Sequence, residues 1–513
     1  EQEIVVKVLA ALEKTEHAEQ LAAQVDGLFY QVRWEAEQAP PASSWQGRWL
    51  IVGDSAGMGA ALADQLTQRG EQVESLPAAA AFSRLQDDSV RWQGVLYLGG
   101  FDPPTRAASL LQSQQASLGT LLTLLQVLAN RRQDRPRLWV ATQQAQALSA
   151  SDPVNPIQSA LWGLGRAIAV EHSDLWGGLV DLDGDSEATA QMLAVELLAE
   201  QTGQERQVAY RHGRRHVARL ARGQSRPGTP TAIDPSASYL VTGGLGALGL
   251  QVATWLGARG ATHLVLTGRR GVTQAAQRSV LEQLAACGVT VQVAELDVAD
   301  EAGMRRLFAE LQTSQAPLRG VFHCAGVLDD GILLNQSWER FERVLSAKVV
   351  GGWLLHELTQ GMELQLMVYF SSASALLGNP GQGGYAAANA FLDGLACLRN
   401  QQGLPGLSIN WGTWAGEGMA ARVGGHLPHM LQPLDGELAL LALEKVLGDS
   451  GSLGIMQIDW EILAAVRQRY AFLASFGTLS SAGQVTSNLA QQLAALALPQ
   501  RSAQLTGYLQ QLV

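Results

Sequence analysis

Seven apolar segments in the C-terminal half of the chain, separated by helix-forming stretches, restrict its fold more than any other feature. A strand that is buried on both faces of a sheet is apolar along its whole length, and strands that alternate with helices form parallel sheets. This half is therefore predicted to be α/β, with a doubly wound parallel sheet. The predicted strands are 239–244, 263–268, 289–297, 320–326, 366–372, 407–412 and 454–460.

The N-terminal half repeats this plan in a weaker form. Residues 47–73 follow the order strand, Gly turn, helix and next strand, and further apolar strands are expected at 94–100, 137–143 and 177–183. The Gly turn, GDSAGMGAAL, only loosely matches a dinucleotide-binding loop, and glycines there also serve helix–strand packing. This half carries no Ser/Tyr/Lys set of its own. We therefore predict two Rossmann-like subdomains, of which the first is degenerate and free of cofactor.

The boundary between the two subdomains is predicted from composition. Residues 223–238 are rich in Gly, Pro and Ser, which favours a loop. The first subdomain is accordingly assigned to 27–225 and the second to 226–475. Residues 28–34 alternate like a strand, and we expect 207–221 to form a hairpin that pairs with them and ties the two halves together.

A glycine-rich turn follows the first strand of the second subdomain and opens a helix. Gly243 permits a tight turn, Gly246 lets the backbone approach a pyrophosphate, and Gly249 allows close packing of helix on strand. The positive end of the helix then faces the phosphates. The predicted cofactor loop consists of Thr242, Gly243, Gly244, Leu245, Gly246, Ala247, Leu248 and Gly249.

Two arginines follow the next strand, in the segment TGRRG at 267–271. A carboxylate at this place would bind the ribose 2′-hydroxyl of NAD, whereas a guanidinium favours the 2′-phosphate of NADPH. Arg269 is our first choice for this contact and Arg270 the second. The alternative for both residues is a solvated basic turn. The sequence therefore predicts NADPH as the cofactor.

Two serines end the strand at 366–372, and a Gly/Pro-rich loop leads from them to a helix that carries Tyr385. A strand-end hydroxyl that faces a helical phenol suits carbonyl reduction, with Tyr385 as proton donor and Ser372 as hydrogen-bonding orienter. Asn389 lies one helical turn beyond Tyr385 on the same face. Because a phenol titrates near pH ~10, it needs a cation close by, and the candidate is Lys348.

These features together resemble the ketoreductase domain of modular polyketide synthases, within the short-chain dehydrogenase/reductase superfamily. The matching motifs are VTGGLGALG, HCAGVLDDG, SAKVVGGWLLHEL, FSSASALLGNPGQGGYAAANAFLDGLA and SINWGTWAGEGM. The wider superfamily usually carries YxxxK, whereas this chain has YAAAN with its lysine on an earlier helix. That exchange is typical of the polyketide and fatty-acid branch. The resemblance extends from about Gly27 to about Leu473.

The resemblance implies a reaction and further cofactor contacts. It implies NADPH-dependent reduction of a β-ketoacyl thioester, carried on the phosphopantetheine arm of an acyl carrier protein, to a β-hydroxyacyl thioester. Lys348 would lower the pKa of Tyr385 and hold the nicotinamide ribose, while Asn389 would orient Lys348 or a relay water. The contacts implied at the adenosine end are Asp297, Val298, Ala325 and Gly326.

A Leu-Asp-Asp motif at 328–330 follows HCAGV directly. In the family that the chain resembles, this motif is typical of B-type reductases, which give the D-configured hydroxyl. The A-type marker would be a Trp eight residues before the tyrosine, where this chain has Leu377. We therefore predict that Leu328, Asp329 and Asp330 guide the phosphopantetheine arm in from one side of the groove, and that the product has the D configuration.

Three further segments are assigned by position. Residues 1–26 have helical periodicity and form either a linker, which we favour, or a self-association helix. Residues 419–434 match the family's mobile lid, and an ordinary helix–loop is the alternative. Residues 476–513 resemble a linker toward a carrier protein, without its attachment site. We therefore expect the chain to be part of a longer synthase, with neighbouring synthase domains as partners.

Composition excludes several other classes of protein. A net charge of −11 argues against a nucleic-acid surface, and no apolar run is long enough to span a membrane. Three cysteines without CxxC spacing fit a reducing cytoplasm and predict neither disulfides nor a metal cluster. Two alternatives to the carrier-linked reductase remain: a non-catalytic ketoreductase-like scaffold, and a short-chain reductase that acts on a free small molecule.

Overall fold

The structure is a computed structural model that describes residues 21–476, except 22, 42–45, 54–56, 100–108, 133, 185, 200–205, 224–230, 417–430 and 467–469. Residues Glu1–Ala474 form one compact unit and Ser475–Val513 a second. The predicted linker helices therefore lie mostly outside the described residues, as does most of the predicted lid. All of the described helices and strands belong to the first unit.

Fifteen strands join both halves of the chain in one continuous sheet, in the order β11-β10-β9-β12-β13-β14-β16-β1-β8-β7-β6-β5-β4-β2-β3. Their bounds are β1 Phe29–Ala36, β2 Arg48–Val52, β3 Gln72–Leu76, β4 Gly94–Tyr97, β5 Arg137–Gln143, β6 Trp176–Leu182, β7 Gln207–Arg211, β8 Arg214–Arg222, β9 Ser238–Thr242, β10 His263–Gly268, β11 Thr290–Glu295, β12 Leu318–His323, β13 Leu366–Ser372, β14 Leu407–Trp411 and β16 Gly451–Ile455. A second, two-stranded sheet pairs β15 (Leu431–Gln432) with β17 (Gln457–Ile458).

The C-terminal half contributes seven parallel strands, from β11 to β16, and thus confirms the predicted doubly wound sheet. One predicted strand was wrong in its extent. The segment 454–460 is divided between β16, which pairs with β14 and β1, and β17, which pairs with β15 in the second sheet. The division depends on which strands lie beside each part, and this is not visible in the local sequence.

The N-terminal half contributes the parallel strands β3, β2, β4, β5, β6 and β7. The predicted hairpin is formed by β7 and β8, and β8 pairs antiparallel with β1 from Tyr30↔Arg222 to Ala36↔His216. The other edge of β1 pairs with β16. The hairpin therefore joins the sheets of the two halves, as predicted.

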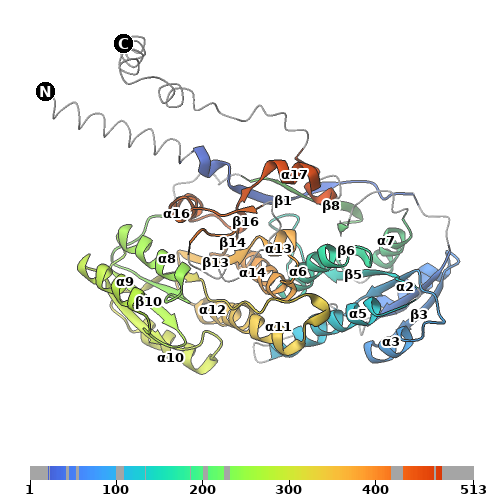
Figure 1. The fold of residues 1–513 in the computed structure, drawn as a ribbon, viewed down its shortest axis with the longest axis horizontal. Coiled ribbons are helices and arrows are strands. Elements are labelled where there is room, and N and C mark those ends of the chain that lie inside the picture. Colours follow the sequence, from blue (N-terminus) through green and yellow to red (C-terminus); the bar gives the residue numbers. More distant parts are fainter. Residues whose placement is uncertain are drawn as a thin grey trace, which may run out of the picture. The chain divides into compact units, whose positions relative to one another are not determined.

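Helices cover the sheet on both sides (Figure 1). Their bounds are α2 Met58–Thr67, α3 Ala78–Leu85, α4 Leu110–Gln114, α5 Thr120–Ala129, α6 Pro156–Glu171, α7 Glu187–Leu198, α8 Ala247–Ala258, α9 Ala275–Ala286, α10 Glu301–Gln312, α11 Trp338–Leu345, α12 Gly351–Thr359, α13 Ser374–Leu377, α14 Gly383–Gln401, α16 Gly436–Val446 and α17 Trp460–Val466. Short 3₁₀ segments lie at η3 (Leu333–Asn335) and η6 (Ala471–Leu473), and π-helical segments at η2 (Gln115–Gly119) and η4 (Ser346–Val350).

The two halves meet where α6 packs on α14, in the middle of Figure 1. Helix α6 begins at Pro156, after Asn155 caps it by accepting from the Ile157 N–H. A Cβ added to Gly163 would lie 2.2 Å from the carbonyl oxygen of Ala386, so only glycine allows the two helices this close approach. Buried side chains of both helices share one core cluster, and each large one contributes about 1.5–3 kcal/mol.

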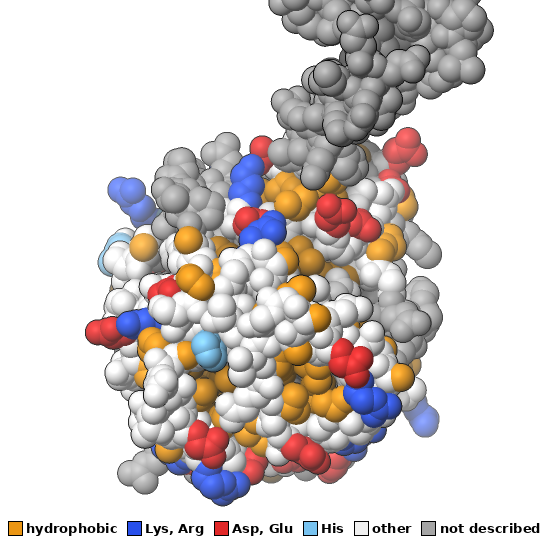
Figure 2. Space-filling view, turned by 90° about the vertical axis from the view of Figure 1, so that its left-hand side faces the viewer, with side chains coloured by type: hydrophobic (Ala, Val, Ile, Leu, Met, Phe, Trp, Pro, Cys, Tyr) orange, Lys and Arg blue, Asp and Glu red, His pale blue; other side chains and the backbone are white. Residues whose placement is uncertain are grey.

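The face on the side of α8, α9 and α10 carries charges of both signs. In Figure 2, Lys and Arg side chains are interspersed with Asp and Glu around a hydrophobic strip. This face therefore presents no strong field of one sign to a polyanion. In the part of the chain that the structure describes, no helix is long and apolar enough to cross a membrane.

Candidate active site

The glycine-rich turn between β9 and α8 lies against the end of β12. Gly243 has φ +66°, and a Cβ there would lie 2.8 Å from the Cα of Ala325, so both the turn and the close approach require glycine. Gly246 precedes α8, and no side chain caps that helix. The first backbone N–H groups of α8 are therefore available to an anion.

A cavity of about 250 Å³ opens in front of this turn. Ten of the predicted cofactor residues line it: Gly243, Gly246, Ala247, Leu248, Gly249, Arg269, Asp297, Val298, Ala325 and Gly326. Small residues, an uncapped helix end and the guanidinium groups of Arg269 and Arg343 suit the pyrophosphate and ribose of a dinucleotide. The residues present thus fit the predicted cofactor.

Four predicted cofactor residues do not line the cavity. The Thr242 hydroxyl lies 2.7 Å from Nδ1 of buried His323, beneath the cavity floor. The Gly244 N–H donates to the Thr267 carbonyl, and Leu245 is buried in the core. The fourth, Arg270, is exposed beyond the cavity wall. The glycine pattern predicts every residue of a continuous loop as a cofactor contact. Because the loop turns tightly, only some of these residues face the cavity.

Eight residues that sequence reasoning missed also line the cavity: Thr267, Gly268, Leu296, Cys324, Val327, Arg343, Ser346 and Ala347. Five of them lie within two residues of predicted contacts at the ends of β10, β11 and β12, so counting the immediate neighbours of each predicted contact would have found them. The other three come from α11 and η4. They reach the cavity through tertiary packing, and no local motif marks them.

The π-helical segment η4 directs Lys348 into the interior. Its ammonium donates to the carbonyl of Phe370 at 2.7 Å and lies 5.5 Å from the centre of the Tyr385 ring. The residue is 2% exposed. Burial lowers the pKa of Lys348 to about 8, against the opposing influence of Cys324 and Asp393. The structure thus brings the predicted lysine and tyrosine together.

Tyr385 is the third residue of α14 and faces the end of β13. Burial raises its pKa to about 12, and nearby Asp330 adds to the rise, while hydrogen bonding by Asn389 and Ser372 opposes it. Burial of the phenol is the largest of these influences, and the prediction that Lys348 lowers the pKa of Tyr385 stays a prediction.

Ser372 and Asn389 complete the predicted set. The Ser372 hydroxyl accepts from the Ser374 N–H at 3.2 Å and from the Ser374 hydroxyl at 3.1 Å. The Asn389 amide donates to the Tyr385 carbonyl at 2.8 Å, and its Oδ1 has no hydrogen-bond partner among the described residues. Lys348 donates to the Phe370 carbonyl at 2.7 Å, and the prediction that Asn389 orients Lys348 or a relay water stays a prediction.

A buried polar network, missed from the sequence, holds α14 against β13 and β14. Asp393 accepts from Ser408 at 2.6 Å and from Asn410 at 2.7 Å. Asn410 also donates to Ser371 at 2.9 Å, and Ser371 donates to the Asn389 carbonyl at 3.2 Å. Burial raises the pKa of Asp393 despite these bonds. The network fixes the backbone of the helix that carries Tyr385.

The Leu-Asp-Asp motif lies between the cavity and the tyrosine. Asp329 forms ion pairs with Arg340, at 2.6 Å, and with Arg343 of the cavity wall. Asp330 accepts from the Gln382 amide at 2.9 Å, just before α14. Both aspartates therefore have defined partners and are not simply solvated loop residues.

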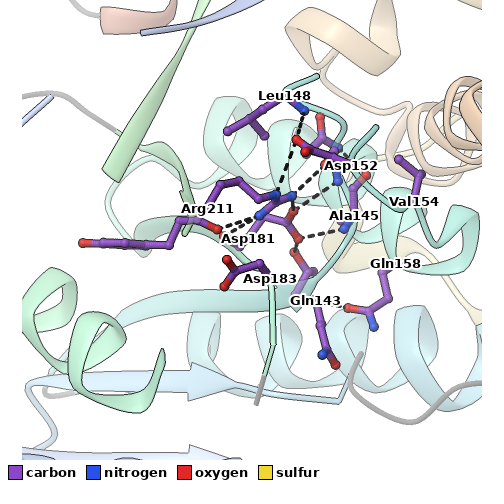
Figure 3. Close-up of polar contacts among 12 residues, drawn as sticks. Gln143, Ala145, Leu148, Asp152, Val154, Gln158, Asp181, Asp183 and Arg211 are labelled. Atoms are coloured by element: carbon purple, nitrogen blue, oxygen red, sulfur yellow. Dashed lines mark hydrogen bonds and ion pairs between the residues drawn. The ribbon is translucent and has the colours of Figure 1, made fainter. Parts of the chain in front are cut away.

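The N-terminal half has its own polar cluster, at the ends of β5 and β6, and its residues differ from those around Tyr385 (Figure 3). Asp181 at the end of β6 accepts from Arg211 at 2.5 Å, from Thr142 at 2.7 Å and from two backbone N–H groups. Arg211 also lies 3.7 Å from Asp152. Every oxygen of Asp181 is thus engaged within the protein, which suits a structural role.

The fold of the C-terminal half, a seven-stranded parallel sheet with a tyrosine-bearing helix after its fifth strand, is of the short-chain reductase type. A family model described as the KR domain matches residues 237–416. Another, described as the Rossmann fold domain of the polyketide synthase extender module SpnB, matches residues 32–220. Each half of the chain is therefore matched separately.

Relatives and solved structures agree with these matches. The chain is 36% identical over 463 residues to polyketide synthase GfsA of Streptomyces halstedii, which covers 86% of this chain and 6% of that protein. It is 38% identical over 387 residues to erythronolide synthase EryA3 of Saccharopolyspora erythraea, with coverages of 73% and 12%. The chain thus spans about a tenth or less of the length of these synthases.

Its structure matches that of A-type ketoreductases from a modular polyketide synthase with a TM-score of 0.77 and 33% identity, over 88% of this chain and 98% of the other. The chain belongs to the ketoreductase domains of modular polyketide synthases. Members of this family are oxidoreductases of the nicotinamide-dependent short-chain type.

Proposed function

We propose that this chain uses NADPH to reduce a β-ketoacyl thioester to a β-hydroxyacyl thioester of D configuration during polyketide biosynthesis. The observation that carries the proposal is the convergence of Lys348, Tyr385 and Ser372 beside a cavity that suits a dinucleotide. The cavity wall ends at Ser346 and Ala347, which Lys348 follows directly.

Residues of this chain donate the proton and stabilise the phenolate that remains. NADPH, when bound, supplies the hydride to the ketone carbon. Tyr385 is protonated at neutral pH, because its pKa is about 12, and it donates this proton to the oxygen that becomes the hydroxyl. Ser372 donates a hydrogen bond to the same oxygen. Lys348, with a pKa of about 8, is charged at neutral pH and stabilises the phenolate that forms.

NADPH is favoured over NADH because an arginine, Arg269, occupies the position expected for a contact with the 2′-phosphate. Arg269 follows β10 and lines the cavity, where a ribose 2′-phosphate would lie. Contacts to the adenosine of the cofactor are assigned to four residues of the same cavity wall: Asp297, Val298, Ala325 and Gly326.

The carrier-bound substrate and the D configuration rest on the Leu-Asp-Asp motif. Asp330 is close enough to Tyr385 to affect its pKa, so this loop borders the place where the ketone must lie. The acyl chain is proposed to arrive on the phosphopantetheine arm of an acyl carrier protein of the same assembly. We further propose that the chain acts in the cytoplasm.

NADPH oxidation measured with a β-ketoacyl N-acetylcysteamine thioester tests the reaction, and chiral analysis of the product tests the stereochemistry. We expect steady oxidation of NADPH, little of NADH, and a D-configured product. NADPH binding without turnover would instead support a non-catalytic scaffold. An L product would overturn the B-type assignment while leaving the reduction itself intact.

A further inference from the structure

Two loops border the candidate active site on the side of Tyr385. The first, here called the Asp loop, comprises residues 328–335, and the second, the Tyr loop, comprises 378–382. They are bonded to each other: the Gly331 N–H donates to the Gly381 carbonyl at 2.8 Å, and the Gln382 amide donates to Asp330 at 2.9 Å. A displacement of one loop would therefore shift the other.

Both loops are held by one carboxylate from the N-terminal half. Glu171 is the last residue of α6, and its Oε1 accepts from the Gly381 N–H at 2.8 Å. Its Oε2 accepts from the Leu333 N–H, also at 2.8 Å. The two bonds span 210 and 162 residues of sequence. Each oxygen therefore serves one loop, and the carboxylate holds both loops at once.

The environment of Glu171 suits a fixed contact. The side chain is half-buried, and burial raises its pKa, while the two N–H groups and His172 oppose the rise. A buried carboxylate that accepts two backbone bonds is costly to move, because each donor left without a partner is destabilising.

Other side chains of the same half contact these loops. The Gln126 amide on α5 donates to the Leu333 and Gln336 carbonyls at 3.0 Å each. The Arg166 guanidinium on α6 donates to the Ala375 carbonyl of α13, just before the Tyr loop, at 2.6 Å. The N-terminal half therefore reaches the site through several polar contacts, and among the described residues only Glu171 bonds to both loops.

We propose that Glu171 is a positioning residue through which the N-terminal half fixes the Asp loop relative to Tyr385. It touches neither the cavity nor the reacting groups, and it acts on Asp330 through Leu333 and Gly381. The inference rests on the proposed function for its catalytic consequence, which is efficient turnover and a single product configuration. Its structural consequence, the joint ordering of two loops, is independent of that function.

The test replaces one acceptor oxygen with a donor, in the variant Glu171→Gln of the whole chain. Hydrogen–deuterium exchange of peptides that cover the two loops is compared with wild type. Because Gln can accept from only one of the two N–H groups, we expect exchange at least about tenfold faster in one or both loops and unchanged elsewhere. Glu187→Gln, an exposed carboxylate on α7 of the same half, is the matched control and should change nothing.

Activity and product configuration give the second readout. With the diketide thioester, Glu171→Gln should lower kcat/KM about tenfold and yield a mixture of configurations, while the Kd for NADPH stays within about twofold. Glu171→Asp keeps the two acceptor oxygens on a shorter side chain, so it should restore part of the loss. If Glu171→Gln fails to fold, the same comparison is made between Glu171→Asp and wild type.

Unchanged exchange in both loops would overturn the proposal, as would faster exchange spread over the whole sheet, which indicates a role in overall stability only. Faster loop exchange with wild-type turnover and a single product would also overturn it. If the wild-type protein does not reduce the thioester, the proposed function is wrong. The exchange experiment would still test whether Glu171 orders the two loops.

Discussion

The two halves of this protein place different side chains at corresponding points of the same architecture. In each, a parallel strand is followed by a long helix and then by the next strand: β13–α14–β14 in the C-terminal half and β5–α6–β6 in the N-terminal half. The strand ends at Ser372 in the C-terminal half and at Gln143 in the N-terminal half. The third residue of the helix is Tyr385 in the C-terminal half and Gln158 in the N-terminal half. The hydroxyl and phenol of one half thus correspond to two amides.

The remaining positions differ in the same way. The seventh residue of the helix is Asn389 in α14 but Trp162 in α6, whose indole fills the space and donates to Thr142 at 2.9 Å. Both halves carry a π-helical segment in the preceding helix, with Lys348 at its third residue in η4 and Ser117 in η2. The N-terminal half thus keeps the π-helical segment but has no lysine in it. The π-helical segment by itself therefore does not create a catalytic site.

The two clusters differ in whether their buried polar atoms all have partners within the protein. In the first half, the Gln158 side chain accepts from the Gln143 N–H at 2.6 Å, and Asp181 is fully engaged. In the second half, Oδ1 of Asn389 is buried and has no hydrogen-bond partner within the described part of the chain. The first arrangement is complete within the protein, whereas the second retains an acceptor for another molecule.

The largest effect is expected at the position where the halves differ most in chemistry. Tyr385→Phe removes the proton donor and should lower kcat about 10³-fold. NADPH binding, measured by fluorescence titration, should be unchanged because the phenol does not line the cavity. Turnover within tenfold of wild type in this variant would contradict the role assigned to Tyr385.

Lys348→Met is expected to lower kcat about 10²-fold, because the phenolate then forms without a cation. Ser117→Ala, at the corresponding residue of the first half, is the control and should leave kcat unchanged. Equal losses in the two variants would mean that the π segments matter for packing alone.

The same lysine predicts a pH dependence of stability. Its pKa in the folded protein is about 8, below the ordinary 10.5, so between these pH values the unfolded chain binds more protons. Its contribution to the free energy of unfolding should therefore rise from pH 8 to 10.5, by about 3 kcal/mol at most. Denaturant melts over this range should show the rise in wild type and not in Lys348→Met.

Arg269→Ala should weaken NADPH binding about tenfold and leave NADH binding unchanged, since only the 2′-phosphate contact is lost. The first half has Pro77 and Ala78 after β3, where the second has two arginines after β10. Arg270→Ala is the matched control, because Arg270 lies outside the cavity lining. Equal losses of NADPH affinity in both variants would indicate a general basic surface instead of a specific contact.

Local patterns in the sequence predicted the sheet and the reactive set, because both depend on short-range features. Apolar runs mark parallel strands, and Ser372 and Tyr385 lie within one strand–loop–helix unit. Arg343, Glu171 and Asp393 were missed, since each acts through contacts that only tertiary packing creates. The burial of Tyr385, which raises its pKa, is likewise a product of tertiary packing that the sequence does not show.

The smallest effect is expected at Gln158, the first-half counterpart of Tyr385. Gln158→Ala removes the bond to the Gln143 N–H and should lower the free energy of unfolding by about 1 kcal/mol, with kcat unchanged. Gln191→Ala, at an exposed site on α7, should alter neither. Tyr385→Phe should show the opposite signature, with catalysis lost and the fold retained. If Gln158→Ala instead lowers kcat while the protein stays folded, the first half contributes to the chemistry and the distinction between the halves fails.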